Sequence, residues 1–246
     1  MKPLSVKNLT AITAGKLLQG SDEVLIQYGA YRLKQVKKPY TALFTDKRIV
    51  NWKSLESLAP LVLVTEWVYS QHEIPQHVII IQVENTDEAY WKFVHYYRSQ
   101  FEIPVIAITG TSGKTTTKEM IKHILSAEKE VTATTLSSNS RTASLQYLLS
   151  IEEETEVAVF ETAVGSPGDV RKAGKYFKPT IGIITNIGAH HLNYCKTLDG
   201  YIQAKGEMAE IVNSDGALIL NAEDANIRKI DLSKFKGRII YIGQQA

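Results

Sequence analysis

The sequence lacks several features that would each place a protein in a particular class. Its single cysteine, Cys195, excludes a disulfide framework and a cysteine-rich metal site, and it suits a reducing compartment. The N-terminus lacks the apolar core of a signal peptide, and no apolar run approaches the roughly 18 residues that cross a bilayer. We therefore expect a cytoplasmic protein that does not insert into a membrane.

An excess of one charge is missing as well. The chain has 28 Lys and Arg residues against 26 Asp and Glu residues, for a formal net charge of +2, and both signs are interspersed. Because this balance gives no electrostatic footprint for nucleic acid, we expect no nucleic-acid partner. The chain also has no internal repeat, low-complexity tract or Gly/Ser-rich linker. Its 246 residues, 44% of them hydrophobic, are enough for one large or two modest domains.

Short apolar runs alternate with helical patterns along the chain. They predict an α/β protein in which a small α/β domain precedes a doubly wound, mostly parallel sheet. Pro104, just before a β-branched run, marks the joint between domains at 1–102 and 103–246. Aromatic residues in a predicted helix at 86–100 resemble a base-stacking platform, but their helical spacing favours core packing. Other strands are expected at 41–44, 61–65, 78–83, 131–135, 156–160, 180–185, 217–220 and 238–242, and helices at 115–127 and 197–212.

Residues 105–118, with the sequence VIAITGTSGKTTTK, combine a β-branched run, a small-residue turn and a helix start. Gly110 and Gly113 allow the turn to fold tightly and to aim backbone N–H groups inward, beside those of the helix N-terminus. In such a P-loop, Lys114 would reach the β- and γ-phosphates of a nucleotide, and the Thr115 hydroxyl would coordinate Mg²⁺. The stretch lacks the first glycine of the general pattern, and the alternative is a turn that binds nothing. Its place between a strand and a helix favours nucleotide binding.

Three further segments present polar side chains after or within a predicted element. Glu161 follows the apolar strand EVAVF, and the carboxyl ends of parallel strands form the ligand-binding edge of a sheet. A metal-facing role is therefore favoured over that of a solvated strand-end carboxylate. His190 and His191 follow a later strand, and in isolation either one is expected to be structural. Lys205 lies in a predicted helix, and its pattern alone indicates a solvated lysine.

The order of these motifs resembles the central domain of the Mur ligase family. The chain carries TGTSGKTT, a loop with Asn139, VFETA, TNIGAHH, QAKGEM and LILNAEDAN in that order. Within the family, the chain is most similar to the members that add D-alanyl-D-alanine to a UDP-muramoyl tripeptide. The resemblance implies an ATP-dependent amide ligase of peptidoglycan precursor synthesis. In such a ligase, a carboxylate takes the γ-phosphoryl group of ATP, and an amine then displaces phosphate from the acyl phosphate.

The resemblance also implies roles for individual residues. Lys114 would hold the transferring phosphoryl group, and Thr115 and Glu161 would bind Mg²⁺. His191 matches the family's metal-binding histidine. Lys205 matches a lysine that becomes carbamoylated and then binds a second Mg²⁺. The implied catalytic residues are thus Lys114, Lys205 and His191. The implied ATP-binding residues are Gly110, Thr111, Ser112, Gly113, Lys114, Thr115, Thr116, Asn221 and Asp224.

The implied partners are small molecules. They are a carboxylate acceptor such as a UDP-muramoyl peptide, bound on the side of the domain at 1–102, and an amino acid or dipeptide. Asn139, Ser140 and Arg141 are the implied substrate contacts, and they stand in a loop where the family usually has Asn-Asn-Glu-x-Gly. We expect a monomer, and relatives continue into a third domain beyond the position of Ala246.

Departures from the family keep two other functions open. The domain at 1–102 lacks the Asp-Ser-Arg and Asp-Gly-His signatures with which relatives hold the UDP-sugar. A ligase of the folylpolyglutamate or poly-γ-glutamate type is therefore one alternative. The other is a nucleotide-binding module without ligase turnover.

Overall fold

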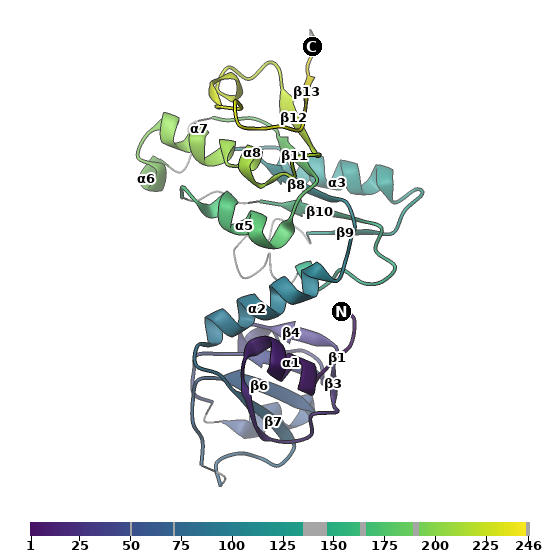
Figure 1. Ribbon diagram of the computed structural model, residues 1–246, viewed down its shortest axis with the longest axis vertical. Helices are drawn as coiled ribbons and strands as arrows, with labels where there is room; N and C mark the ends of the chain where they lie inside the picture. Colours follow the sequence, from purple (N-terminus) through teal and green to yellow (C-terminus); the bar gives the residue numbers. More distant parts are fainter. Residues whose placement is uncertain (50, 71, 135–146, 163–165, 189–191, 245–246) are drawn as a thin grey trace. The chain divides into compact units, whose positions relative to one another are not determined.

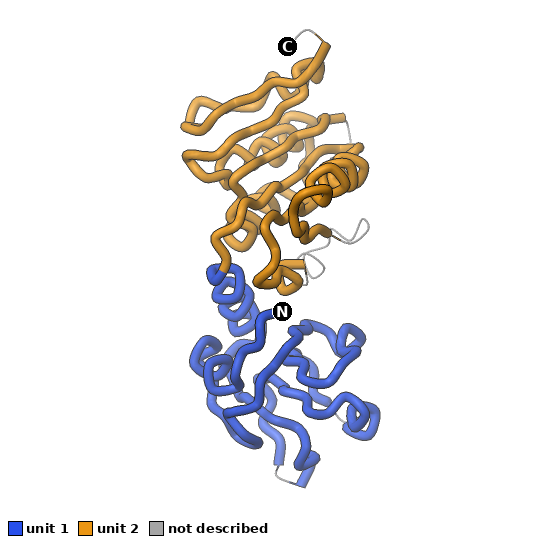
Figure 2. The backbone as a smooth tube through the Cα atoms, turned by 90° about the vertical axis from the view of Figure 1, so that its right-hand side faces the viewer, with its two compact units in different colours: residues 1–100 blue, residues 101–246 orange. Residues whose placement is uncertain are grey.

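The chain forms two compact units, residues 1–100 and 101–246 (Figure 2). The computed structural model describes the whole chain except residues 50, 71, 135–146, 163–165, 189–191 and 245–246. None of the helices in these described parts is long and apolar enough to cross a membrane. Each unit has its own sheet and its own buried hydrophobic cluster.

A five-stranded sheet forms the centre of the first unit. Its elements are β1 (Leu4–Ser5), α1 (Val6–Thr13), β2 (Lys16–Gln19), β3 (Leu25–Ile26), β4 (Tyr28–Ala30), η1 (Leu33–Gln35), β5 (Thr41–Phe44), η2 (Trp52–Leu58), β6 (Leu61–Thr65), β7 (Val78–Gln82) and α2 (Thr86–Ser99). The strand order is β2-β7-β6-β5-β4. Strands β4 to β7 are parallel, whereas β2 pairs antiparallel with β7. β1 and β3 form a separate antiparallel pair.

The aromatic side chains of α2 pack into the core of this unit. The helix starts after Asn85, whose side chain accepts the Glu88 N–H as an N-cap. Tyr90 and Phe93 are fully buried, and their rings lie 5.1 and 5.3 Å from the ring of Phe44. The expectation that these residues pack in a core is confirmed.

A six-stranded parallel sheet forms the centre of the second unit (Figure 1). Its elements are β8 (Val105–Thr109), α3 (Lys114–Leu125), β9 (Val131–Ala133), β10 (Val157–Glu161), α5 (Asp169–Phe177), β11 (Ile181–Ile184), α6 (Leu192–Cys195), α7 (Leu198–Gly206), α8 (Met208–Ile211), β12 (Ala217–Asn221), η3 (Ile227–Lys229) and β13 (Arg238–Ile242). The strand order is β13-β12-β11-β8-β10-β9.

Helices cover both faces of this sheet. Ile106 and Ile108 of β8 pack in one cluster with residues of α3. Ala107 lies between them in sequence and joins the cluster on the other face, which contains Tyr201 of α7 and Met208 of α8. Successive strand residues point to opposite faces, so β8 is buried on both sides. The expected α/β fold with a doubly wound parallel sheet is confirmed.

The single helix expected at 197–212 is divided into α7 and α8 at Glu207. The Glu207 side chain is buried and accepts the N–H groups of Gly168 and Arg171 at 2.7 and 3.3 Å. Both groups lie at the amino end of α5, where helical N–H groups have no partner within the helix. Glu207 therefore caps a different helix, and this tertiary contact has no local sequence signature.

Candidate functional site

The P-loop joins β8 to α3, as the sequence predicts. Gly110 and Gly113 have φ angles of +152° and +78°, which favour glycine. A Cβ atom on Gly110 would lie 1.9 Å from Oγ1 of Thr185, which follows the neighbouring strand β11. The loop can therefore approach β11 this closely only with glycine at position 110.

The residues after β11 hold the P-loop in shape. The Thr111 N–H donates to the Asn186 carbonyl at 2.9 Å, and the Ser112 N–H donates to Oδ1 of Asn186 at 3.0 Å. The Thr185 hydroxyl donates to the Ser112 carbonyl at 2.7 Å. The Gly188 N–H donates to the Thr111 hydroxyl oxygen at 2.9 Å. Asn186, in the motif TNIGAHH, is thus a structural partner of the loop.

Lys114 begins α3, and its side chain folds back over the loop. Its Nζ donates to the carbonyl oxygens of Gly110 and Thr111 at 3.0 and 3.3 Å. Burial lowers the pKa of this amine. Thr115 and Thr116 follow in the first helical turn, half-buried and exposed respectively. An ammonium group, a helix N-terminus and hydroxyl groups are together the kind of groups that can hold a polyphosphate.

Glu161 ends β10 and pairs with Ile108 of β8, so it lies beside the P-loop. Its side chain is fully buried, and its Oε1 lies 3.6 Å from Nζ of Lys118. Neither carboxylate oxygen has a hydrogen-bond partner among the described residues. A buried carboxylate with open acceptor positions suits Mg²⁺, which prefers hard oxygen ligands. In the same described ranges, no three His, Cys, Asp or Glu residues group closely enough to hold a metal by themselves.

Lys205 of α7 is buried. The prediction from its helical pattern alone, that this lysine is exposed to solvent, is therefore wrong. The residue is 1% exposed. Its Nζ lies 3.4 Å from the Thr109 hydroxyl oxygen and 4.8 Å from the ring centre of Tyr201. Burial, together with the positive charge of Lys114, lowers the pKa of Lys205 from 10.5 to about 7. A large part of this amine is therefore neutral, and hence nucleophilic, near neutral pH.

Asn221 and Asp224, at the end of β12, lie at the same edge of the sheet. The Asn221 amide donates to the Thr185 carbonyl at 3.2 Å. The two Asp224 carboxylate oxygens accept the N–H groups of Ile187 at 2.8 Å, Asn226 at 2.8 Å and Ile227 at 3.0 Å. Asp224 thus joins the loops after β11 and β12, a structural role that its motif did not predict.

Some of the expected site residues lie close together in the structure, and others are not among the residues that it describes. Three of them lie around the carboxyl end of β8: Lys114, Glu161 and Lys205. Lys114 contacts Gly110, and Lys205 contacts Thr109. The charge of Lys114 also acts on Lys205, and that of Glu161 acts on Lys114. The expected metal ligand His191 and the expected substrate contacts Asn139, Ser140 and Arg141 lie outside the described residues.

Lys118 is a buried residue of this site that the sequence analysis did not single out. It lies one turn after Lys114 on α3, and its side chain is fully buried beside Glu161. The sequence does contain one indication of this role. Lys118 is four residues after Lys114, and residues four apart on a helix lie on the same face. A lysine on the face of a helix that covers a sheet is expected to have a buried partner.

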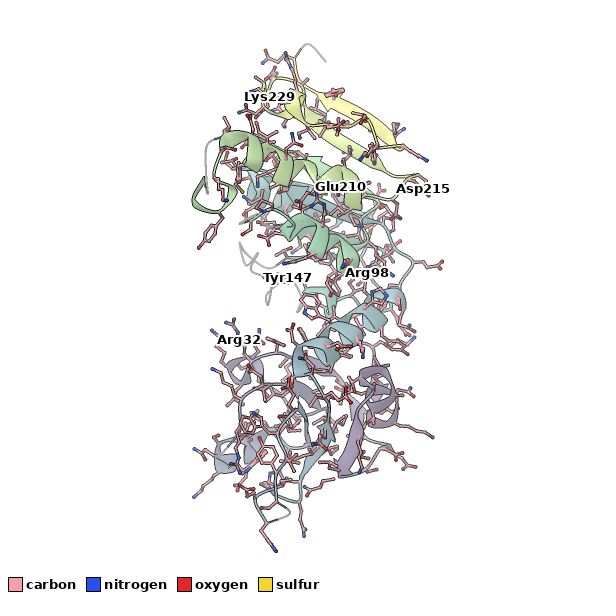
Figure 3. The ribbon with its side chains drawn as sticks, turned by 60° about the vertical axis from the view of Figure 1, so that its left-hand side comes forward. Arg32, Arg98, Tyr147, Glu210, Asp215 and Lys229 are labelled. Atoms are coloured by element: carbon pink, nitrogen blue, oxygen red, sulfur yellow. The ribbon has the colours of Figure 1, made fainter. Side chains whose placement is uncertain are left out.

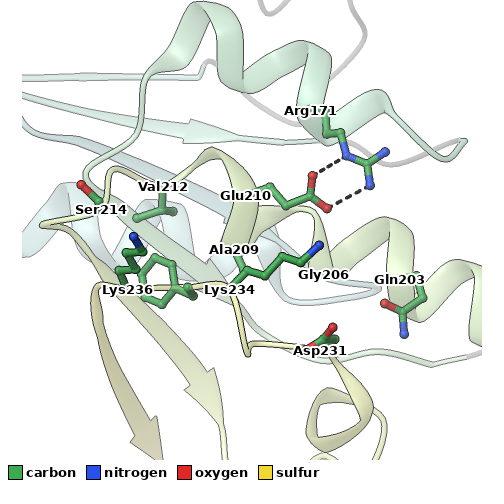
Figure 4. A pocket seen from close by; sticks show the side chains of 11 residues that line it. Arg171, Gln203, Gly206, Ala209, Glu210, Val212, Ser214, Asp231, Lys234 and Lys236 are labelled. Carbon is green, nitrogen blue, oxygen red and sulfur yellow. Dashed lines mark hydrogen bonds and ion pairs between the residues drawn. The ribbon is translucent and has the colours of Figure 1, made fainter.

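A pocket of about 700 Å³ lies elsewhere in the second unit. Its lining includes Ser214 and Lys236, which precede β12 and β13, so it is at the amino ends of the strands. Glu210 of α8, labelled in Figure 3, lines it next to Arg171, and two hydrogen bonds of 2.5 and 2.9 Å join the two side chains (Figure 4). The P-loop is at the carboxyl ends, so this pocket is separate from it.

The sequence is similar to those of known proteins. Residues 108–246 match the Mur ligase middle domain. A UDP-N-acetylmuramoyl-tripeptide–D-alanyl-D-alanine ligase of Rickettsia prowazekii is 34% identical over 163 residues, which are 66% of this chain and 36% of that protein. The ligase of the same name from Synechocystis is 32% identical over 161 residues, which are 65% of this chain and 36% of that protein.

Solved structures share the fold. A crystal structure of MurF from Acinetobacter baumannii has a TM-score of 0.83 and 24% identity, covering 99% of this chain and 54% of that one. MurF from Thermotoga maritima in complex with ADP has a TM-score of 0.74 and 21% identity, covering 89% of this chain and 51% of that one. The chain spans 36% of the length of each of the two related ligases. Since the matched domain covers more than half of the sequence, the chain belongs to the Mur ligase family.

Proposed function

We propose that this chain acts as an ATP-dependent ligase of the Mur type, which joins D-alanyl-D-alanine to a UDP-muramoyl tripeptide. The names of both related ligases state this reaction. The observation that carries the proposal is the cluster of Lys114, Glu161 and Lys205 around the P-loop. It supplies a phosphate-binding cation, an open carboxylate and a neutral amine within one site.

The proposed reaction has two steps. A carboxylate oxygen of the acceptor forms a bond to the γ-phosphorus of ATP, and the bond from that phosphorus to the β–γ bridging oxygen breaks. The products are an acyl phosphate and ADP. The amine nitrogen then forms a bond to the acyl carbon and loses a proton, while phosphate leaves with the electron pair of the carbon–oxygen bond. Lys114 and the loop N–H groups neutralise charge on the phosphate oxygens.

We propose Thr115, Glu161 and His191 as residues that hold Mg²⁺. The two acceptor positions left open on the buried Glu161 carboxylate fit this role. Bound Mg²⁺ would supply positive charge that brings the phosphate and carboxylate oxygens into line. Lys205 would become a further ligand when its neutral Nζ bonds to the carbon of CO₂ and releases a proton, which gives a carbamate. Asn221 and Asp224 are proposed on the adenine side.

The substrate side is a proposal as well. We assign the domain at 1–102 to the carboxylate acceptor and the domain at 103–246 to ATP. Asn139, Ser140 and Arg141 are the proposed contacts to the acceptor. The incoming amine is an amino acid or dipeptide, and the names of both related ligases contain the dipeptide D-alanyl-D-alanine.

The test combines a calorimetric ATP titration with a phosphate-release assay. Wild-type protein should bind ATP with Mg²⁺, and Lys114→Ala should abolish that binding. Lys122→Ala is the matched control, because Lys122 is an exposed lysine on the same helix. The release assay contains ATP, Mg²⁺, UDP-muramoyl tripeptide and D-alanyl-D-alanine.

Each outcome of this pair of assays has a distinct meaning. Phosphate release that requires both substrates supports the ligase. Binding of ATP without release supports the second candidate, a nucleotide-binding module without turnover. Equal ATP affinity of the wild-type protein and Lys114→Ala would contradict both.

A further inference from the structure

Lys118 of α3 is an ammonium group enclosed between a helix and a sheet. Its side chain is 0% exposed, and α3 packs on β8, β9 and β10. Its Nζ lies close to oxygen atoms of Thr134, Glu119 and Glu161. The Thr134 carbonyl lies at 2.6 Å, Oε1 of Glu119 at 2.7 Å and Oε1 of Glu161 at 3.6 Å. A buried charge requires such partners, because an uncompensated one is strongly unfavourable.

The three distances show that the ammonium group interacts differently with Glu161 than with Thr134 and Glu119. The two shorter contacts, to Thr134 and Glu119, have hydrogen-bond length. The contact to Glu161, at 3.6 Å, is longer than a hydrogen bond. Lys118 therefore attracts the Glu161 carboxylate by its charge without occupying the acceptor positions of that carboxylate. Both Glu161 oxygens stay open among the described residues.

We propose that Lys118 is a positioning residue that holds the Glu161 carboxylate in place for Mg²⁺. This inference rests on the proposed binding of ATP and Mg²⁺. The ammonium stabilises the negative carboxylate when no metal is bound, and its anchors on Thr134 and Glu119 fix its own place. The carboxylate is then already oriented before a cation binds next to ATP, so that little reorganisation accompanies binding.

The test measures how much Mg²⁺ strengthens ATP binding. Calorimetric ATP titrations with Mg²⁺ and with EDTA give this ratio for each protein. Glu161→Gln should lose the Mg²⁺ enhancement. Lys118→Met should reduce it by about tenfold or more, as substitutions behind a metal ligand do. Its ATP affinity in EDTA should equal that of the wild-type protein, whereas a general structural defect would lower both affinities.

A single-charge variant serves as the control. Lys122→Met removes an exposed lysine from the same helix. It should keep the wild-type enhancement. A double variant, Lys118→Met with Glu161→Gln, should match Glu161→Gln alone, because two residues that act through one interaction are not additive.

The outcomes separate this inference from the proposed function. Absence of any Mg²⁺ enhancement in the wild-type protein would overturn the proposed metal site. A wild-type enhancement that Lys118→Met retains would overturn the role of Lys118 alone. If Lys118→Met does not fold, the double variant, which lacks both charges, decides the question. A lower ATP affinity in EDTA for the double variant than for Glu161→Gln would then overturn the inference.

Discussion

The burial of Lys205 links the stability of the protein to pH. The pKa of this amine is about 7 in the folded protein, against an ordinary value of 10.5. Between these values the unfolded chain binds a proton that the folded chain does not. The free energy of unfolding therefore rises with pH, by at most about 1.4 kcal/mol per pH unit. We predict that Lys205→Met loses this rise. Denaturant titrations in CO₂-free buffer measure it, and a wild-type slope in the variant would contradict it.

Thr109 is placed to orient the Lys205 amine. Its hydroxyl donates to the Thr162 carbonyl at 3.1 Å, so its oxygen can accept from Nζ of Lys205 at 3.4 Å. We predict that Thr109→Val lowers the carbamate formation constant of Lys205 about fivefold, the effect of one hydrogen bond. Thr109→Ser keeps the hydroxyl and is the matched control. The carbamate is measured by NMR after addition of labelled bicarbonate, with Lys205→Met as the blank. Equal signals from both Thr109 variants would exclude this role.

The P-loop, as an element, depends on the close approach between β8 and the end of β11. We predict that Gly110→Ala destabilises the protein by more than about 2 kcal/mol, since the added Cβ meets Thr185 and φ is positive. Gly188→Ala is the control, because no heavy atom of the described residues would lie closer than 3.8 Å to its Cβ. Chemical denaturation measures both. Gly113→Ala has positive φ, but the nearest described heavy atom would lie 3.9 Å from its Cβ, so it should fall between them.

Local patterns predicted most elements of the fold. The strands expected at 41–44, 61–65 and 238–242 have the bounds observed for β5, β6 and β13. Buried parallel strands appear as continuous apolar runs, which end sharply at turn residues. The P-loop was predictable for the same reason, because a strand, two glycines and a helix start stand next to one another in the sequence.

Contacts between distant segments were not predictable in this way. From the sequence alone, Lys205 resembles a solvated helix lysine, but the fold brings it next to Thr109 of β8. Glu207 resembles an ordinary helix residue, but it accepts N–H groups at the amino end of α5. Asp224 accepts the N–H of Ile187, 37 positions earlier. Helical or strand periodicity describes neighbours in sequence only. Motif order pointed to Lys205 through resemblance, whereas nothing pointed to the partners of Lys118.

At the scale of the whole molecule, each unit contains what an independent domain requires. The first unit has a buried cluster around Leu43, Leu63 and Ile80. The second has clusters on both faces of its own sheet. Units with separate cores can fold separately. The P-loop, Glu161 and Lys205 all lie within residues 101–246.

We therefore predict that a fragment of residues 101–246 folds cooperatively and binds ATP as tightly as the whole chain. The same fragment with Lys114→Ala should fold equally well and bind no ATP, which separates folding from binding. Residues 1–100 alone should fold without binding ATP. Circular dichroism during denaturation and calorimetric titration of each fragment provide the measurements. An unfolded 101–246 fragment, beside a whole chain that unfolds in one transition, would mean that the second unit depends on the first for its stability.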